Sequence, residues 1–90
     1  MIDTETIAAV KATVEREGAE ETTVGTLRKS WPGIHFTYCM DDDIGALDPY
    51  QEAKGFNIYL VTGREHCISF TSAPENATGL VIAALEDEED

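Results

Sequence analysis

Two cysteines and two histidines are the residues of this chain that could ligate a metal or carry out thiol chemistry. Cys39 and Cys67 do not form a CxxC pair, and no Cys/His spacing matches a zinc finger. His35 and Cys39 are four residues apart in a strand-like segment, so their Cα atoms lie about 13 Å apart and cannot share one zinc ion. We therefore expect two reduced thiols. A thiol- or metal-handling protein that uses Cys39, Cys67, His35 and His66 is the alternative hypothesis.

The run Asp41, Asp42 and Asp43 is the densest charge cluster before the C-terminal end. An EF-hand loop requires oxygen ligands at alternate positions, but Gly45 stands where the third ligand should be. The run is therefore more typical of a solvated strand end. The chain contains no P-loop, no dinucleotide fingerprint and no GxSxG motif, and no spacing assembles a nucleophile with a base. We predict no catalytic residue, no cofactor and no metal, in a protein that is not an enzyme.

A polar sheet face is the better candidate site. Strand-like alternation places His35, Thr37, Cys39, Asp41, Asn57, Tyr59, Cys67, Ser69 and Thr71 on one face, opposite the predicted helices. A solvated face of this kind is ordinary for antiparallel sheets. A face that only contacts water does not need Tyr, His and Cys side chains together. The functional interpretation of this face is therefore a docking surface or a small-ligand site. The candidate interaction face comprises His35, Thr37, Cys39, Asp41, Asp42, Asp43, Asn57, Tyr59 and Cys67.

The charge balance narrows the class of partner. Eighteen acidic residues against six basic ones give a formal net charge of −12. This charge argues against nucleic acid and against an anionic membrane surface, both of which attract basic residues. It favours a protein partner with a basic surface. No apolar run approaches the roughly 18 residues of a membrane-spanning helix, and the N-terminus has no signal-peptide pattern, so we expect a cytoplasmic protein.

Two stretches near the N-terminus have helical periodicity. Apolar residues three and four apart predict an amphipathic helix over 4–17, which Gly18 ends. A second helix is predicted to begin after Thr22 or Thr23 and to end at Pro32. The apolar stripes consist of Ile7, Val10 and Val14 in the first helix and Val24, Leu27 and Trp31 in the second.

From residue 34 the period changes from 3.6 to 2. Alternating apolar residues predict strands over 34–41, 56–61 and 67–71. Residues 79–85 are predicted as a further strand, with a helix over 77–85 as the alternative. The connection from 41 to 55 is long, and Asp48-Pro49 followed by Gly55 suggests a short helix within it.

The register of one hairpin follows from keeping apolar residues on one face. A three-residue loop, 63–65, would pair Leu60 with Ile68 and Ile58 with Phe70, whereas a two-residue loop at 63–64 would not. We therefore predict the three-residue loop.

The predicted architecture is α+β, with two N-terminal helices packed on one face of a three- or four-stranded antiparallel sheet. Residues 1–85 would form a single domain, and the acidic residues 86–90 a disordered tail. The most buried core residues are predicted to be Trp31, Phe36, Ile58, Leu60, Ile68 and Phe70.

Four sequence blocks carry a resemblance to a known family: PGIHFTYCMDDDI (32–44), GFNIYLV (55–61), HCI (66–68) and ATGLVIA (77–83). The chain resembles a family of small uncharacterised bacterial proteins that are found with nitrogen-fixation genes. The resemblance covers residues 24–85, and it implies a nitrogen-fixing setting but no activity and no catalytic residue. Together with the charge, it predicts a small acidic, non-enzymatic accessory or interaction protein. A small-ligand sensor on the polar face is a further alternative.

Overall fold

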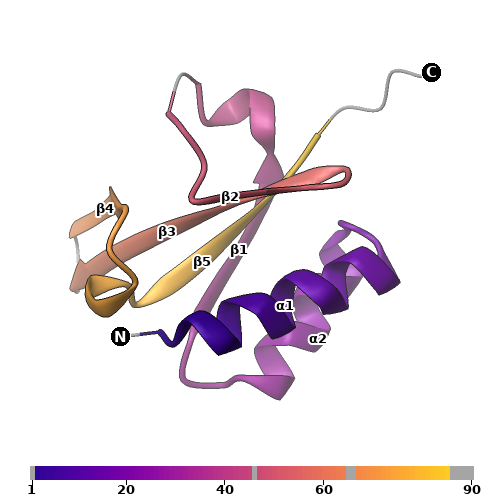
Figure 1. Cartoon of the computed structure of the whole chain (residues 1–90), viewed down its shortest axis with the longest axis horizontal. Helices are drawn as coiled ribbons and strands as arrows, with labels where there is room; N and C mark the ends of the chain where they lie inside the picture. The colour runs from indigo at the N-terminus through magenta and orange to yellow at the C-terminus, as the bar shows by residue number, and fades with distance from the viewer. Residues whose placement is uncertain (1, 46, 65–66, 86–90) are drawn as a thin grey trace.

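The computed structural model describes residues 2–45, 47–64 and 67–85 of the chain. Two helices are followed by five strands and two short 3-10 turns (Figure 1). The elements are α1 (Thr4–Glu17), α2 (Glu21–Ser30), β1 (His35–Met40), η1 (Asp41–Asp43), β2 (Gln51–Ala53), β3 (Phe56–Arg64), β4 (Cys67–Thr71), η2 (Pro74–Asn76) and β5 (Gly79–Ala84). The predicted acidic tail lies outside the described residues.

Both predicted helices are present. Helix α1 buries its whole predicted stripe, whereas α2 buries Val24 and Leu27 but Trp31 lies just past its end and is only half-buried. Helix α1 spans the predicted residues, and Gly18 ends it with a positive φ of 105° while its N–H donates to the carbonyl of Val14. Helix α2 begins at Glu21, slightly earlier than predicted, and its threonines form no side-chain cap at its N-terminus. Within the described part of the chain, neither helix has the length and apolar character needed to cross a membrane.

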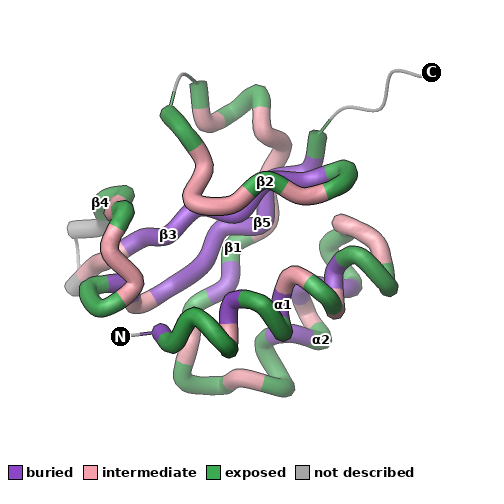
Figure 2. Tube along the Cα trace, viewed as in Figure 1, coloured by how far each residue is buried: buried purple, intermediate pink, exposed green. Residues whose placement is uncertain are grey.

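The sheet is mixed, which corrects the prediction of a purely antiparallel sheet. Strand order is β1-β5-β3-β2, and β4 pairs with β3 beside β2. Strand β5 pairs in parallel with β1 and antiparallel with β3, so the last strand lies in the middle of the sheet. Every residue of β5 is buried, as expected for a strand that has a neighbouring strand along each of its two edges (Figure 2). Residues 79–84 are thus a strand, as predicted.

The register between β3 and β4 differs from the predicted one. Leu60 pairs with Thr71 and Val61 pairs with Phe70, whereas the predicted partners of Leu60 and Ile58 were Ile68 and Phe70. Paired residues share a face, so this register places Phe70 on the face away from the helices, here called the outer face. Strand β3 continues through residues 63 and 64, which were assigned to the loop, and residues 65–66 lie outside the described residues.

The predicted short helix between residues 48 and 55 is also absent. Residues 51–53 form β2, which pairs antiparallel with the start of β3. Ala53 pairs with Phe56, so residues 54 and 55 are a two-residue hairpin loop, and Gly55 has the positive φ of 89° that such turns require. The glycine that suggested a helix stop is therefore a hairpin residue.

Two groups of buried side chains lie on opposite faces of the sheet. The larger core joins both helices to the inner face of the sheet and includes Phe36, Ile58 and Leu60, as predicted. Trp31 packs against this core but is only half-buried, and Phe70 is 46% exposed, so neither belongs to its centre. The burial of Ile68 lies outside the description. The smaller group is on the outer face and consists of Tyr59, Val61, Val81 and Ala83.

Helix α2 also covers the edge of the sheet at β1. The Arg28 guanidinium donates from Nε and Nη2 to the backbone carbonyl of Phe36, at 3.3 and 3.1 Å. An edge strand otherwise leaves such carbonyls open to pairing with another chain. This contact therefore helps to position β1 and to block its edge.

Gly79 begins β5 at a close approach of three strands. A Cβ atom at this position would lie 2.8 Å from the His35 carbonyl oxygen and 3.1 Å from Cγ2 of Val61. We expect Gly79→Ala to lower the free energy of unfolding by about 1–3 kcal/mol, because backbone must move to admit the methyl group. Gly25→Ala is the matched control, since nothing lies within 4 Å of its Cβ position on α2. Urea unfolding should show that this control is neutral or stabilising, and equal losses in both variants would contradict the account.

Candidate functional site

The outer face is organised around the carboxylate of Asp41. Its Oδ1 accepts hydrogen bonds from Asn57 Nδ2 at 3.0 Å and from the Tyr59 hydroxyl at 2.9 Å. The Tyr59 hydroxyl also lies 3.4 Å from the Leu47 carbonyl oxygen. These contacts connect β3 to the turn η1 and to the loop that follows it. Asp41, predicted as an exposed interaction residue, is therefore a structural acceptor that holds this loop against the sheet.

Tyr59 is 3% exposed, although its position in the alternating pattern predicted a solvated face. Burial, together with the hydrogen bond to Asp41 and the negative charge of that carboxylate, raises the pKa of Tyr59 to about 12. The phenol is therefore neutral at physiological pH and acts as a hydrogen-bond donor.

Cys39 is a half-buried free thiol on the same face. Burial and then the carboxylates of Asp43 and Asp41 raise the pKa of the Cys39 thiol. A raised pKa reduces the thiolate fraction, and the thiolate is both the nucleophile and the metal ligand. The surroundings of Cys39 thus disfavour the chemistry that a thiol-handling protein would require.

We expect iodoacetamide to modify Cys39 in a folded Cys67→Ser background several-fold more slowly than it modifies the unfolded chain at pH 8. Asp43→Asn should accelerate the reaction of the folded protein, because it removes one of the charges that raise the thiol pKa. Asp48→Asn is the control, since Asp48 is not among the groups that shift this pKa. A rate for the folded protein equal to the unfolded rate would mean that Cys39 is an accessible, unperturbed thiol.

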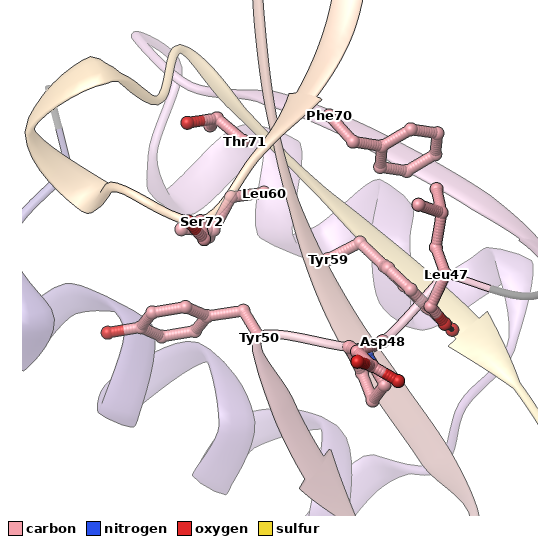
Figure 3. A pocket seen from close by; sticks show the side chains of 9 residues that line it. Leu47, Asp48, Tyr50, Tyr59, Leu60, Phe70, Thr71 and Ser72 are labelled. Atoms are coloured by element: carbon pink, nitrogen blue, oxygen red, sulfur yellow. Dashed lines mark hydrogen bonds between the residues drawn. The ribbon is translucent and has the colours of Figure 1, made fainter.

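A hollow of about 360 Å³ opens where the far edge of the sheet is interrupted. Strands β2 and β4 pair with different halves of β3, and the hollow lies between them; we call it the edge hollow. In Figure 3 the side chains of Leu47, Tyr59 and Phe70 gather at one side of it, while Tyr50 extends away from them. Leu47 and Phe70 are 47% and 46% exposed, and the exposed Asp48 also lines the hollow.

A second hollow, of about 450 Å³, lies on the outer face and shares Phe70 with the first; we call it the face hollow. The sheet register brings residues of four strands together there, because His35, Gly79, Val61 and Phe70 follow one another across the paired strands. The space at Gly79 itself is filled by its neighbours on β1 and β3. The hollow is lined mainly by apolar groups, including Val61, Val81 and Phe70.

The rings of Tyr59 and Phe70 contact each other in the wall of the edge hollow. Their centroids are 5.7 Å apart at an interplanar angle of 71°, an edge-to-face contact. Such a pair contributes about 0.5–1.5 kcal/mol beyond the burial of apolar area. Phe70 is thus held in place while almost half of its surface remains exposed, which is the arrangement expected of a preorganised contact residue.

The structure brings together only part of the predicted interaction face. Asp41, Asn57 and Tyr59 form one network, and Cys39 lies beside it. Asp42 and Asp43 are exposed in η1, while His35 and Thr37 line the face hollow instead. The observed register places the side chains of β4 on the sheet face opposite to the predicted one. Cys67 belongs to β4, but its side chain lies outside the described residues. Leu47, Asp48, Val61, Phe70 and Val81 were not among the predicted site residues.

The thiol and histidine residues of the alternative hypothesis are not assembled in the described structure. Strands β5 and β3 lie between β1, which carries Cys39, and β4, which carries Cys67. Three strand spacings amount to about 14 Å, well beyond the roughly 7 Å limit for disulfide Cα atoms. Among the described residues, no group of three or more His, Cys, Asp or Glu side chains is placed to hold a metal ion. His66 lies outside the described residues.

Comparison with known protein families gives one match. A family of unknown function, DUF6129, is matched over residues 10–85. The chain belongs to this family. The match extends beyond the resemblance seen in the sequence blocks and takes in most of α1 together with the whole sheet. Neither the curated proteins nor the solved structures contain a match to the chain.

Proposed function

We propose that this protein is a non-enzymatic interaction module that binds a partner protein through the outer face of its sheet. The observation that supports this proposal most strongly is the exposure of Phe70 and Leu47 beside the edge hollow. Aromatic residues held rigidly at a surface hollow are typical contact residues of protein interfaces. The docking surface consists of Leu47, Asp48, Tyr59 and Phe70 together with the face hollow.

The partner surface is proposed to be basic. Asp48 lines the edge hollow, and Asp42 and Asp43 are exposed in the turn that Asp41 attaches to the same face. Among the described residues that line the two hollows, none is a lysine or an arginine. A chain of net charge −12 attracts a positively charged protein and accelerates its association. Apolar contacts would supply affinity, and the acidic rim would select the partner.

The alternative functions have weaker support. A thiol- or metal-handling role would need a reactive thiol, but the pKa of Cys39 is raised and β1 and β4 are separated by two strands. A small-ligand sensor would use the face hollow, whose volume falls in the roughly 300–1,000 Å³ range of ligand sites. Its Thr78 hydroxyl already accepts a hydrogen bond from the Gly63 N–H. The side chains of His35 and Thr37 are the other polar groups of the lining that could orient a small molecule.

A nitrogen-fixing setting remains part of the proposal. The four sequence blocks, with their resemblance to proteins found with nitrogen-fixation genes, support it. The family match supplies no function. The source of partner proteins for the first experiment is therefore an extract of nitrogen-fixing cells, with an extract of the same cells grown on ammonium for comparison.

The proposal is tested with Phe70→Ser and Leu85→Ser. Leu85 is the control because it is also an exposed apolar residue, at 40%, and lines neither hollow. Proteins captured by the wild type are identified, purified and titrated against all three proteins. We expect Phe70→Ser to weaken binding of the purified partner by about tenfold or more, whereas Leu85→Ser should bind as the wild type does. Equal affinities for wild type and Phe70→Ser would overturn the proposed surface.

Charge is tested separately with Asp42→Asn and Asp48→Asn. Both carboxylates are exposed, so we expect each variant to be as stable as the wild type or slightly more stable, since removal of a negative charge relieves repulsion. Each should weaken association with the partner at low salt. The difference should fade near 1 M salt, where the Debye length is about 3 Å. A loss of stability above about 1 kcal/mol would instead identify a structural acceptor.

A further inference from the structure

The edge hollow combines an apolar wall, hydroxyl groups and a single carboxylate. Figure 3 shows Leu47 and Phe70 on one side of it, whereas the hydroxyl-bearing side chains of Tyr50 and Ser72 lie on the other. Asp48 is the one charged residue among the described residues that line it. We infer that this hollow receives one arginine side chain of the partner protein. The inference rests on the proposed docking function and names the contact that the edge hollow makes in it.

The backbone on both sides of Asp48 is attached to β3. The Leu47 carbonyl oxygen lies 3.4 Å from the Tyr59 hydroxyl, and the Tyr50 N–H donates to the Ile58 carbonyl oxygen at 2.9 Å. The residue after Asp48 is a proline, whose ring fixes φ between these two attachments. The position of the Asp48 backbone is thus set before a partner arrives, which reduces the ordering cost of binding.

The carboxylate of Asp48 is available to a cation. Asp48 is exposed, and no lysine or arginine in the described part of the chain forms an ion pair with it. The turn that Asp41 attaches to the same face adds the exposed carboxylates of Asp42 and Asp43 and no basic residue. The net charge of −12 further strengthens the attraction of a positively charged group.

Arginine matches both kinds of surface in the hollow. Its aliphatic stem can lie against the exposed side chains of Leu47 and Phe70. Its planar guanidinium has five N–H donors, so it can pair with both oxygens of a carboxylate and also donate to a hydroxyl oxygen. The guanidinium can in addition stack on an aromatic ring, whereas a lysine ammonium has the charge without the planar fork.

The size of the hollow and the energetics of interfaces agree with a single arginine. The volume of about 360 Å³ is near the lower end of the roughly 300–1,000 Å³ range of small-molecule sites, which suits one long side chain. Arginine is also one of the residue types that contribute most to binding when they occupy a pocket at an interface. The partner is thus expected to project an arginine from its basic surface into the edge hollow.

Four capped amino acids test this inference, each as its N-acetyl N-methylamide. Citrulline has nearly the size of arginine but no charge, lysine has the charge but no planar fork, and norleucine has an apolar stem alone. Each is titrated into the full-length, nitrogen-15-labelled protein at constant ionic strength, and amide chemical shifts report both affinity and position. Because a ligand of this size binds weakly, the titrations extend to tens of millimolar.

We expect the arginine derivative to bind about threefold more tightly than the lysine derivative, and about tenfold more tightly than the citrulline and norleucine derivatives. The shift changes that it causes should be concentrated in residues 47–50 and 70–72, which line the edge hollow.

Two pairs of variants locate the contact. Asp48→Asn should weaken binding of the arginine derivative about fivefold. Asp42→Asn makes the same change in net charge outside the hollow, so it should leave that affinity unchanged. Phe70→Ala should weaken binding about threefold because it removes the apolar wall, whereas Leu85→Ala should have no effect.

Several results would overturn the inference. Equal affinities for the arginine and citrulline derivatives, or equal losses in Asp48→Asn and Asp42→Asn, would show that the hollow does not recognise the guanidinium through Asp48. Tighter binding of the lysine or norleucine derivative would assign the hollow to a different side chain. An absence of shift changes in residues 47–50 would show that arginine does not enter it.

The docking function itself would survive each of these results if the natural partner still loses affinity for Phe70→Ser. It would fail only if that variant and the wild type bind the partner equally.

Discussion

Phe36→Ala should lower the free energy of unfolding by about 3–5 kcal/mol, whereas Phe70→Ala should lower it by about 1 kcal/mol or less. Phe36 is 5% exposed in the core between the helices and the sheet, and its truncation leaves a cavity there. Phe70 is 46% exposed and loses chiefly its edge-to-face contact with Tyr59. The larger loss is a substantial part of the total stability expected for a domain of this size.

Urea unfolding of the two variants under identical conditions checks this difference. The sequence pattern alone assigns both phenylalanines to the core, so it predicts similar losses for both. Comparable losses of several kcal/mol would show that β4 pairs with β3 in the register that keeps Phe70 beneath the helices. That outcome would also remove the basis of the docking surface, since Phe70 would no longer be exposed.

The second large effect is a loss of stability at alkaline pH. The pKa of Tyr59 is raised from 10.0 to about 12, so the folded state retains a proton that the unfolded chain releases above pH 10. The unfolded state then binds fewer protons, and the free energy of unfolding falls as the pH rises from about 10 to about 12. A shift of this size corresponds to about 2–3 kcal/mol. Below pH 10 this contribution is fully present.

Tyr59→Phe isolates this effect from the titration of other groups. The wild type should lose about 2–3 kcal/mol more than the variant between pH 9 and pH 12. In the folded protein, the difference in phenolate absorbance between wild type and variant should titrate near pH 12. A midpoint close to pH 10 would show that Tyr59 is solvated and that Asp41 does not hold the loop against the sheet.

Local periodicity predicts the helices and the positions of most strands. Apolar residues three and four apart define α1 and α2, and alternation locates β1, β3 and β4. The same alternation does not specify which strands are neighbours, so it could not show that β5 lies between β1 and β3. It also fixes which residues share a face within one strand but not which face meets the helices. The face of β4 that meets the helices was predicted by grouping its apolar residues with those of β3, and this prediction was wrong.

The candidate site was less predictable than the fold because its contacts are long-range. The carboxylate of Asp41 accepts hydrogen bonds from Asn57 and Tyr59, 16 and 18 residues away. Asn57 and Tyr59 are buried on a face that the pattern predicted to be solvated, whereas His35 and Thr37 on the same predicted face are exposed. The exposure of Leu47 in the loop and of Phe70 in β4 depends on the same arrangement. An apolar residue beside Asp48-Pro49 in a long loop was the one local signal for the edge hollow.

Hydrogen–deuterium exchange of the purified complex with its captured partner tests the central claim most directly. We predict that the partner protects amides on the outer face, chiefly in residues 47–50, 59–61 and 69–72, and leaves exchange in α1 and α2 unchanged. Phe70→Ser should lose this protection at the same protein concentrations, whereas Leu85→Ser should keep it. Protection confined to the helices, with no change at residues 47–50 and 69–72, would contradict the account.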